Sequence, residues 1–525
     1  MATAALASLP DDAVVGVLRA LPMQSLAVAR CVCKAWRDIV DDRALLYPYL
    51  CPRSVRGAFI NYVDHNRPHH FARPTSSSTL PQVDGMLRFL PNDHRRDWWS
   101  LLDHCNGLLL CDIDWESTLC ICNPATRRWT MLPPGADGKC HRYAGAYVAF
   151  DPAVSPHYEV ILIPELPEKP PSPKQQDLRK ERWVLPEDAP LCLDRLFSLS
   201  PDDDDIISIC DEEEEFEQLP TMNDEESLEH DIVDDEPCRL MEWPPSPWML
   251  RVFSSRTGHW EERSFVSESK PAGTVEQMRL DPEEPTFRGP RRRYAIYHHG
   301  SLYVHCRGSF VIRLSLSKGK YQIIEAPANI EYTKPYLGKL QKSVCFGIVH
   351  DNQLKIWILN EPCGKMEWVL KYEVEVGLYA KYLGAMPYGK NGRQPDGSWI
   401  VQEDNINTEY TDDGVETPLE RNYEWDSDND DIVNIEGQEY YFWSQGLNII
   451  GFHPFKEVVF MVEWFGVVAY HLNSSKIQYL GNSRPKCYFR NHTNGIYESF
   501  VYTPCMIGEL VHGDETGQSS CEEDY

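Results

Sequence analysis

Two stretches of the sequence have residue types at spacings that could carry out chemistry. Gly384 followed by Gly389 and Lys390 has the spacing of a phosphate-binding loop, in which backbone amides and a lysine hold phosphates. However, Asn391 stands where such a loop needs a Ser or Thr hydroxyl for magnesium, and Pro387 stiffens the turn. The spacing therefore does not predict a nucleotide site.

The second stretch resembles the start of a calcium-binding loop. Asp426, Asp428 and Asp430 have the alternation of the first calcium ligands in a helix-loop-helix site. Asp431 occupies the position that requires glycine, and Glu436 falls one residue too early for the last ligand. We expect weak adventitious calcium binding at most, and no resident metal or other cofactor.

The cysteines do not form a pattern of metal ligands. Their number, seventeen, is odd, and no two have the Cys-x-x-Cys spacing. Cys31 and Cys33, like Cys120 and Cys122, are one residue apart, which suits neither a zinc site nor a redox motif. We expect the cysteines to act as small core residues in a reducing compartment.

No catalytic constellation is evident elsewhere in the chain. The pairs His69-His70 and His298-His299 would point to opposite faces of a strand, so they would not readily share a metal. No Gly-x-Ser-x-Gly nucleophile motif occurs. The run Arg291–Arg293 is typical of a solvated turn rather than a nucleic-acid contact. We therefore expect no catalytic residues.

The first forty residues predict two short amphipathic helices. Ser8 and Asp11 suggest a capping box, Pro10 suits the first helical turn, and Pro22 separates the two helices. Apolar residues follow helical spacing in both: Val14, Val17, Leu18 and Leu21, then Leu26, Ala29, Cys33, Trp36 and Val40, with Val28, Val32 and Ile39 beside them. So wide an apolar arc must be covered, in part by another protein.

This stretch resembles an F-box across roughly residues 6 to 45. The resemblance is carried by Leu9-Pro10, Val14, Leu18, Leu21-Pro22, Leu26, Val32-Cys33-Lys34-Ala35-Trp36-Arg37 and Ile39. It implies docking on the Skp-family adaptor of a cullin-type ubiquitin ligase. The residues predicted to contact that adaptor are Leu9, Pro10, Val14, Leu18, Leu21, Pro22, Leu26, Val32, Cys33 and Trp36. The alternative is a helical hairpin that packs only on its own domain.

The acidity of the chain is local. The net charge over 525 residues is −29, but residues 202–236 hold eighteen Asp or Glu and no Lys or Arg. Residues 402–439 hold fourteen acids and one Arg, so the remaining chain is close to neutral. We expect solvated disordered insertions at both places. The alternative is that the acidic loop engages a basic partner, or competes with one at the binding face.

The rest of the chain predicts short strands. A turn residue stands six positions before an aromatic at Asn123 to Trp129, Ser254 to Trp260, Ser315 to Tyr321 and Asn473 to Tyr479, with looser copies at Asp151 to Tyr158 and Asn360 to Trp368. Each copy predicts a hairpin whose aromatic packs between sheets. Units that recur every forty to sixty residues favour propeller blades over a sandwich.

This part is similar to the plant F-box-associated domain, which resembles kelch-like propellers. The similarity is carried by residues 104–111, 121–129, 132–134, 149–160 and 252–260, and extends weakly to about residue 510. The two acidic insertions depart from the family pattern and leave the number of blades open. The fold class predicted is a small helical F-box followed by a β-propeller-like domain with long acidic disordered insertions.

The expected organisation follows from these patterns. We predict an F-box at 1–48, a connector at 49–100, a β domain in three parts at 101–166, 248–390 and 438–512, a disordered insertion at 167–247, a second acidic insertion at 391–437 and a flexible acidic tail at 513–525.

The expected function is that of a non-catalytic substrate receptor in a Skp-cullin-F-box ubiquitin ligase. The F-box would bind the adaptor and the propeller face would hold a protein target, which the sequence does not identify. The alternatives are a ligase-independent scaffold and, more remotely, an enzyme built on the propeller. No apolar run is long enough for a membrane span, and an acidic chain does not suit nucleic acid. We therefore expect a cytoplasmic or nuclear protein.

Overall fold

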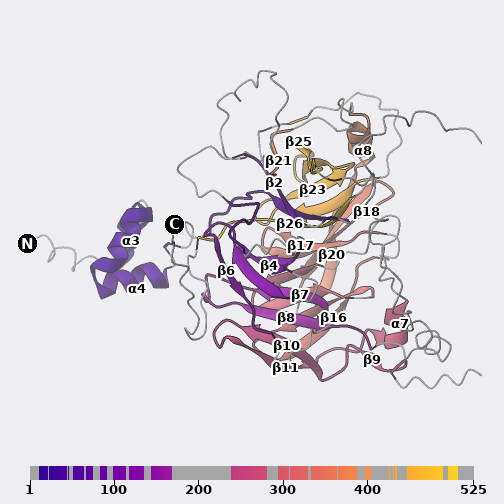
Figure 1. Cartoon of the computed structure of the whole chain (residues 1–525), viewed down its shortest axis with the longest axis horizontal. Coiled ribbons are helices and arrows are strands. Elements are labelled where there is room, and N and C mark those ends of the chain that lie inside the picture. The colour runs from indigo at the N-terminus through magenta and orange to yellow at the C-terminus, as the bar shows by residue number, and fades with distance from the viewer. Residues whose placement is uncertain are drawn as a thin grey trace, which may run out of the picture. The chain divides into compact units, whose positions relative to one another are not determined.

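The computed structural model describes residues 11–46, 51–74, 83–90, 99–113, 118–134, 143–167, 238–280, 294–328, 333–386, 397–403, 446–488 and 495–506, apart from a few positions within these ranges, together with Trp425, Asp430, Ile432 and Val433. These residues form an N-terminal helical region and a larger β domain (Figure 1). None of the described helices has the length and apolar run that crossing a bilayer requires.

The helical region has three helices instead of the two predicted. They are α2 (Asp11–Arg19), α3 (Met23–Val32) and α4 (Lys34–Asp42). The second predicted helix is interrupted at Cys33, whose Sγ accepts a hydrogen bond from the backbone N–H of Trp36 at 3.4 Å. The sulfur therefore satisfies one of the amides in the first turn of α4, as a cap does.

A small apolar core holds the three helices together. Its fully buried members are Val14, Val15, Leu18, Leu26, Ala29, Val40 and Leu45, and Leu21, Trp36, Ile39 and Leu46 are partly buried against them. An exposed ion pair between Arg43 and Asp12, at 3.7 Å, joins the end of α4 to the start of α2. Burial, rather than this ion pair, supplies the stability of the region.

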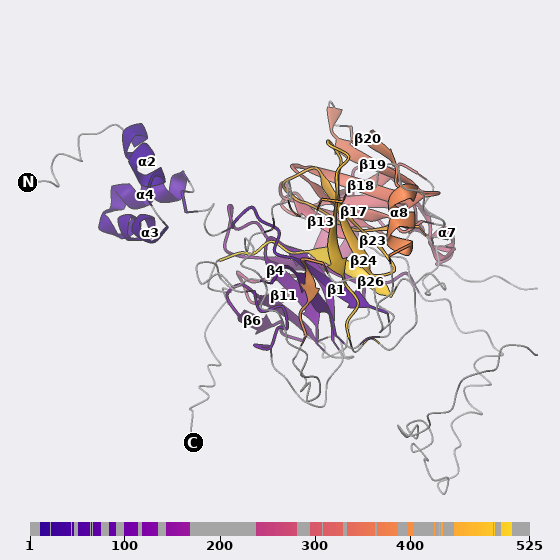
Figure 2. The ribbon, with the colours of Figure 1, turned by 90° about the horizontal axis from the view of Figure 1, so that it is seen from above.

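The described β domain contains four four-stranded sheets, one eight-stranded sheet and a two-stranded pair (Figures 1 and 2). The eight-stranded sheet consists of two antiparallel groups of four strands, so the domain has six four-stranded antiparallel units, termed blades 1 to 6. Blade 1 comprises β3 (Ser100–Cys105), β4 (Leu108–Asp112), β5 (Leu119–Asn123) and β6 (Arg128–Met131). Blade 2 comprises β7 (Tyr143–Ala149), β8 (Glu159–Pro164), β10 (Trp248–Ser254) and β11 (His259–Ser267). Blade 3 comprises β13 (Ala295–His298), β14 (Ser301–His305), β15 (Phe310–Ser315) and β16 (Lys320–Glu325). A short parallel pairing of β11 with β16 joins blades 2 and 3.

Blades 4 and 5 continue the pattern, and blade 6 combines distant parts of the chain. Blade 4 comprises β17 (Tyr336–Leu340), β18 (Ser343–His350), β19 (Gln353–Asn360) and β20 (Glu367–Glu375). Blade 5 comprises β22 (Asn448–Phe452), β23 (Val458–Glu463), β24 (Gly466–His471) and β25 (Ile477–Asn482). Blade 6 has the order β26 (Ile496–Val501), β1 (Ala58–Tyr62), β2 (His69–Ala72) and β21 (Ile400–Val401).

Blade 6 changes the predicted organisation in two places. The segment 49–100, expected to be a connector, supplies β1 and β2, and β3 begins at Ser100. Residues 391–437, expected to be an acidic insertion, supply β21 and the buried Trp399, which packs against Phe71 at 5.5 Å between ring centroids. Both segments have apolar residues, which burial in the sheet stabilises.

The long insertion also returns to the fold earlier than predicted. Residues 167–247 include β9 (Glu242–Trp243), which pairs with β12 (Gly273–Thr274) ahead of the short helix α7 (Val275–Arg279). Trp243 and Trp248 are buried against each other at 6.0 Å between ring centroids. A second helix, α8 (Gly377–Gly384), follows β20.

The first strands of the blades form a closed ring. Contacts run from β3 to β7, β13, β17, β22 and β26 in turn, and β1 returns to β3. The last junction depends on Asn61, whose amide donates to the backbone carbonyl of Leu101 at 2.7 Å and accepts from its N–H at 3.1 Å. The same Nδ2 also donates to Glu498 at 3.1 Å. The buried Asn61 thus pairs with β3 as a neighbouring strand would.

Alternating strand direction gives the β domain two distinct faces. The turn face carries the first-to-second and third-to-fourth connections of the blades, and the chain enters β1 and leaves β26 there. Asn106 in the β3–β4 turn donates to the carbonyl of Phe150 after β7 at 2.6 Å, as expected if the two strand ends share this face. A cavity of about 310 Å³ lies between turns of blades 4 and 5, with Gln341, Glu457 and Asn473 in its wall.

The other connections define the long-connection face. They are the second-to-third connections and those between blades, and they include residues 165–247 and 402–447. Within the second of these, Asp430 pairs with Arg73 just after β2, and the N–H of Val433 donates to the carbonyl of Ile477 at the start of β25, so described residues of this connection reach the turn face. The two faces therefore differ in the length of the chain attached to them.

The sequence repeats correspond to hairpins within blades. Asn123 to Trp129, Ser254 to Trp260, Ser315 to Tyr321 and Asn473 to Tyr479 span the turn between the third and fourth strands of blades 1, 2, 3 and 5. Tyr321 is buried, whereas Trp129 is 37% exposed. The aromatic therefore packs inside in some blades and lies on the surface in blade 1. The sequence also predicts a strand from Tyr440 to Trp443, which lies outside the described residues.

Replacing Asn61 with Ala tests the ring closure. The change removes three hydrogen bonds and leaves the Leu101 N–H and C=O without that partner, so we expect a loss of about 2–4 kcal/mol in the free energy of unfolding. Chemical denaturation monitored by tryptophan fluorescence measures it. Ser474→Ala, on an exposed turn of blade 5, is the control. A loss no larger than that of the control would contradict this role.

His70 on β2 predicts a pH dependence of stability. Its side chain is 1% exposed. Burial lowers the pKa of His70 to about 4, and the hydrogen bond to Gln402 raises this pKa by less than burial lowers it. In the unfolded chain this histidine binds its proton near pH 6.5. The stability that the neutral, buried His70 contributes is therefore present above pH 6.5 and is lost as the pH falls toward 4. From pH 7 to pH 5 the expected loss is about 2 kcal/mol.

The variant His70→Gln isolates this contribution. It cannot titrate, so its free energy of unfolding should fall less than that of the wild type between pH 7 and pH 5, by about the same 2 kcal/mol. His259→Gln changes an exposed histidine and should keep the wild-type slope. Equal slopes for His70→Gln and the wild type would rule out the assigned role of His70.

Candidate functional site

The helical region exposes apolar side chains that its own core does not use. Val28 and Val32 on α3 are 66% and 60% exposed, and Val17 on α2 is 53% exposed. Val28 and Val32 are four residues apart, so they lie on the same side of the helix. Large apolar residues exposed together on a short helix mark a surface that another protein can cover.

The structure divides the ten predicted contact residues into groups. Val14, Leu18 and Leu26 pack together inside the helical core, and Leu21 and Trp36 are partly buried beside it. Val32 and Cys33 are exposed at the junction of α3 and α4. Leu9, Pro10 and Pro22 lie outside the described residues. The buried members position the helices, and a direct contact by any of the ten stays a prediction.

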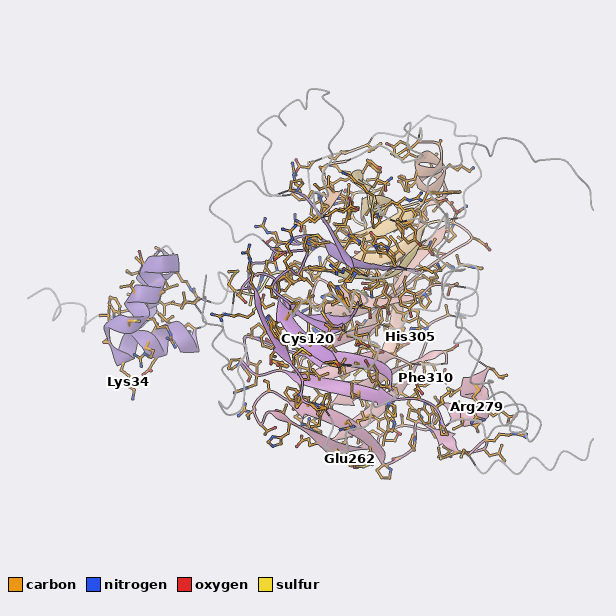
Figure 3. The ribbon with its side chains drawn as sticks, in the orientation of Figure 1. Lys34, Cys120, Glu262, Arg279, His305 and Phe310 are labelled. Atoms are coloured by element: carbon orange, nitrogen blue, oxygen red, sulfur yellow. The ribbon has the colours of Figure 1, made fainter. Side chains whose placement is uncertain are left out.

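Two exposed residues were absent from the predicted contact set. Val17 and Val28 belong to the apolar arc that the sequence revealed, but a pattern of spacing does not say which edge of a wide arc turns inward. The fold settles this because Leu18, Leu26 and Ala29 face the core. Lys34 starts α4 next to Cys33, and its side chain extends away from the helices (Figure 3).

The interior of the β ring is filled by aromatic side chains at β26. Tyr336 donates its hydroxyl hydrogen to the backbone carbonyl of Ser499 at 2.9 Å, and the N–H of Ser499 donates to the hydroxyl of Tyr294 at 3.4 Å. The two tyrosine rings lie 4.0 Å apart between centroids, and Tyr294 also meets Phe500 at 6.1 Å. These groups satisfy the backbone of an inner strand, which is a structural role.

Buried titratable groups near the ring also have structural partners. Burial raises the pKa of Asp103 well above its usual range, while the backbone N–H of Val148 donates to its carboxyl group at 2.8 Å. Burial lowers the pKa of His104 to about 4. Asp103 links β3 to β7, so this carboxyl group joins two blades. Among the described residues, Asp103 belongs to no group of three or more His, Cys, Asp or Glu side chains that could hold a metal ion.

Several cysteines lie inside the β domain, as the sequence predicted. Cys111, Cys120, Cys122 and Cys345 are fully buried, and Cys120 lies within the packed strands (Figure 3). Burial raises the pKa of the Cys120 and Cys345 thiols. Such thiols are poor nucleophiles. Among the described residues, no group of three or more His, Cys, Asp or Glu side chains could hold a metal ion.

Comparison with known proteins agrees with the N-terminal geometry. The family model described as F-box-like matches residues 6–53. The chain is 27% identical over 168 residues to F-box protein At3g08750 of Arabidopsis thaliana, covering 31% of this chain and 42% of that protein. It is 30% identical over 129 residues to putative F-box protein At3g16210 of the same plant, covering 24% and 34%.

A third relative has a name that includes kelch repeats. F-box/kelch-repeat protein At3g61590 of Arabidopsis thaliana is 30% identical over 135 residues, covering 24% of this chain and 30% of that protein. The chain matches less than half the length of each of these relatives. It therefore carries an F-box-like domain at its N-terminus, followed by a propeller-like β domain, and is similar to plant F-box proteins.

Proposed function

We propose that this chain is a substrate-receptor subunit of a Skp-cullin-F-box ubiquitin ligase. F-box domains generally bind Skp-family adaptors, and F-box proteins are generally receptors that bring a target to the ligase. The subunit performs no chemistry itself. It holds the adaptor at one end and a target at the other, which raises the effective concentration of the target near the ubiquitin-charged enzyme.

The exposed apolar surface of the helical region carries the adaptor half of this proposal. Val28 and Val32 remain uncovered by the helical core although they are aliphatic and adjacent on α3. Burying aliphatic side chains in a partner is a main source of interface free energy. Trp36, which is partly buried and follows them closely in sequence, adds an aromatic anchor of the kind that dominates interfaces.

The geometry of the β domain supports a target-binding half. Residues 51–57, which follow the helical region in the chain, reach the turn face next to the end of β26, where Cys51 Sγ lies 3.7 Å from Cys505 Sγ. The long connections leave the opposite ends of the strands. Loops on a rigid scaffold commonly carry recognition. We propose that the target binds the long-connection face, away from this attachment point.

A ligase-independent scaffold and a propeller-based enzyme are the alternatives. The enzyme would need His, Asp or Glu side chains converging in the ring. In the part of the ring that the structure describes, the aromatic side chains of Tyr294, Tyr336 and Phe500 fill the region at β26. The buried His104 packs against Phe500 at 5.6 Å between ring centroids. This aromatic packing favours a binding protein over an enzyme. The scaffold shares the same contacts, so only turnover of the target distinguishes it from a receptor.

Charged substitutions on α3 test adaptor binding. Val28→Glu with Val32→Glu should weaken capture of a purified Skp-family adaptor at least about tenfold, because two desolvated aliphatics become acids. Ala13→Glu with Ala20→Glu places two acids at exposed positions, one in α2 and one just after it, and should bind normally. Thermal unfolding of the helical region should match in both variants. Undiminished capture by the α3 variant would contradict the proposed surface.

Leu9 and Pro10, which lie outside the described residues, are tested in the same adaptor-capture assay. Leu9→Ala with Pro10→Ala should abolish adaptor capture while the β domain keeps its thermal unfolding transition. Capture at the wild-type level would remove Leu9 and Pro10 from the contact set.

Turnover of a bound target separates the receptor from the scaffold. A protein that co-purifies with the chain through the β domain should accumulate in cells when residues 1–48 are deleted or when the proteasome is inhibited. Quantitative mass spectrometry of the co-purified proteins measures this. A partner that binds equally but never changes in abundance would favour the scaffold.

A further inference from the structure

Two cysteine thiols meet where the chain enters and leaves the β domain. Cys51 Sγ lies 3.7 Å from Cys505 Sγ, although 454 positions separate the two residues in the sequence. Both side chains are thiols in this structure. The sulfurs of a disulfide are about 2.0 Å apart, so an approach of roughly 1.7 Å would bring this pair to bonding distance. Neither thiol belongs to the proposed adaptor contacts.

Backbone pairing holds the two segments side by side. The N–H of Arg56 donates to the carbonyl of Tyr502, and the N–H of Tyr502 donates to the carbonyl of Gly57, each at 2.9 Å. These bonds continue the ladder of β1 and β26 beyond the pair formed by Ala58 and Val501. The closeness of the two thiols therefore rests on the same pairing that closes the ring.

Cys505 is held in place by blade 1. Its side chain is 0% exposed, and its carbonyl accepts a hydrogen bond from the Asn123 side chain at 2.9 Å. A Cβ atom added to Gly107 would lie 2.4 Å from the Cβ of Cys505, so the β3–β4 turn packs directly against this cysteine. Formation of a disulfide would therefore require Cys51 to make most of the movement.

Cys51 lies in a segment that can make this movement. It is partly exposed, and residues 51–57 form neither a helix nor a strand. Its side chain packs at the edge of the apolar cluster that contains Cys505. Irregular surface segments are more mobile than strands. Cys51 is therefore the thiol that a reagent in solution meets first, and Cys505 is the buried partner behind it.

A second pair of thiols provides an internal comparison. Cys111 Sγ lies 4.0 Å from Cys122 Sγ, which is nearly the same separation. Both side chains are 0% exposed, and they lie on the paired strands β4 and β5, where Cys111 stands opposite Cys120 and Cys122 stands opposite Leu109. This pair has the proximity but lacks the exposure and the irregular backbone, so we expect it to stay reduced in the folded protein.

We propose that Cys51 and Cys505 form a redox-modification site whose oxidant is a low-molecular-weight disulfide. The Cys51 thiolate attacks one sulfur of the oxidant, which forms a mixed disulfide and releases the first small thiolate. The Cys505 thiolate then attacks Cys51 Sγ, which closes the protein disulfide and releases the second small thiolate. The two protein sulfurs lose two electrons to the oxidant, and their two protons end on the two released thiols.

The protein disulfide would lock the ring at the point where the chain enters. It would join the segment before β1 covalently to the segment after β26, and so enclose nearly the whole β domain in one loop. Cross-links that close long loops stabilise a fold by restricting its unfolded chain. Disulfides in reducing compartments are usually transient and redox-sensing. The site therefore stabilises the β domain only when the surrounding pool of small thiols becomes oxidised.

Oxidation of the full chain with glutathione disulfide tests this proposal. The contact with Cys505 and burial raise the pKa of the Cys51 thiol, which slows the reaction at neutral pH, so the incubation is carried out at about pH 8. After alkylation, non-reducing peptide mapping by mass spectrometry should find the disulfide between Cys51 and Cys505, with Cys111 and Cys122 still reduced. The thermal unfolding midpoint of the β domain should rise by at least about 3 °C, and dithiothreitol should reverse both changes.

Three variants separate this site from the other cysteines. Cys51→Ser should abolish both the disulfide and the rise in the midpoint, while the midpoint before oxidation stays close to that of the wild type because Cys51 is only partly buried. Cys238→Ser removes another partly exposed thiol and should keep both effects. Cys505→Ala leaves Cys51 without its resolving thiol, so the reaction should stop at the mixed disulfide on Cys51.

The proposal is wrong if Cys51 and Cys505 both remain thiols in the folded, oxidised sample. It is equally wrong if Cys111 and Cys122 are linked to the same extent, because oxidation would then follow proximity or unfolding and not the site. A bond between Cys51 residues of two chains, seen as a dimer on a non-reducing gel, would assign Cys51 to an intermolecular contact. An equal rise in the midpoint for the wild type and Cys51→Ser would place the effect elsewhere in the chain.

Discussion

The pairing of β26 with β1 is the constraint on which the rest of the β domain depends. Residues 58–62 pair antiparallel with residues 496–501, so strands from opposite ends of the domain share one blade. Asn61 extends this closure to β3 through two hydrogen bonds with the backbone of Leu101. Without this pairing, the first and sixth blades would expose strand edges and apolar faces that now pack against each other.

Ring closure also determines where the attached parts of the chain lead. Because β26 and β1 are neighbours, the chain enters and leaves the β domain on the turn face, as the contact between Cys51 and Cys505 illustrates. Alternating strand direction places the second-to-third connections, including the long one between β8 and β10, at the opposite ends of the strands. The same topology thus separates the point where the F-box-like domain joins from the loops proposed to hold a target.

Much of the local structure could be predicted from the sequence. The hairpins at Asn123 to Trp129 and Ser315 to Tyr321 have turn residues at fixed distances from an aromatic, and this local signal does not depend on distant partners. The apolar spacing after residue 10 likewise identified helices. The acidic stretches were evident because composition alone reveals them.

Other features depend on contacts that the sequence does not display. The strand β1 pairs with β26, which lies more than four hundred residues later, and β2 pairs with β1 and with the distant β21. Residues 58–72 therefore resembled a connector. The interruption at Cys33 arises from a hydrogen bond to its sulfur, which apolar spacing cannot indicate. Similarly, Val28 and Leu26 look alike in the sequence, and only packing of the three helices buries one and exposes the other.

The most direct test of the central claim is hydrogen exchange of the full chain with and without a purified Skp-family adaptor. We predict a one-to-one complex in which slowed exchange is confined to residues 9–46, with α3 most protected and the β domain unchanged. Failure to form a complex, or protection found in the β domain but not in α3, would contradict the proposed role of the helical region.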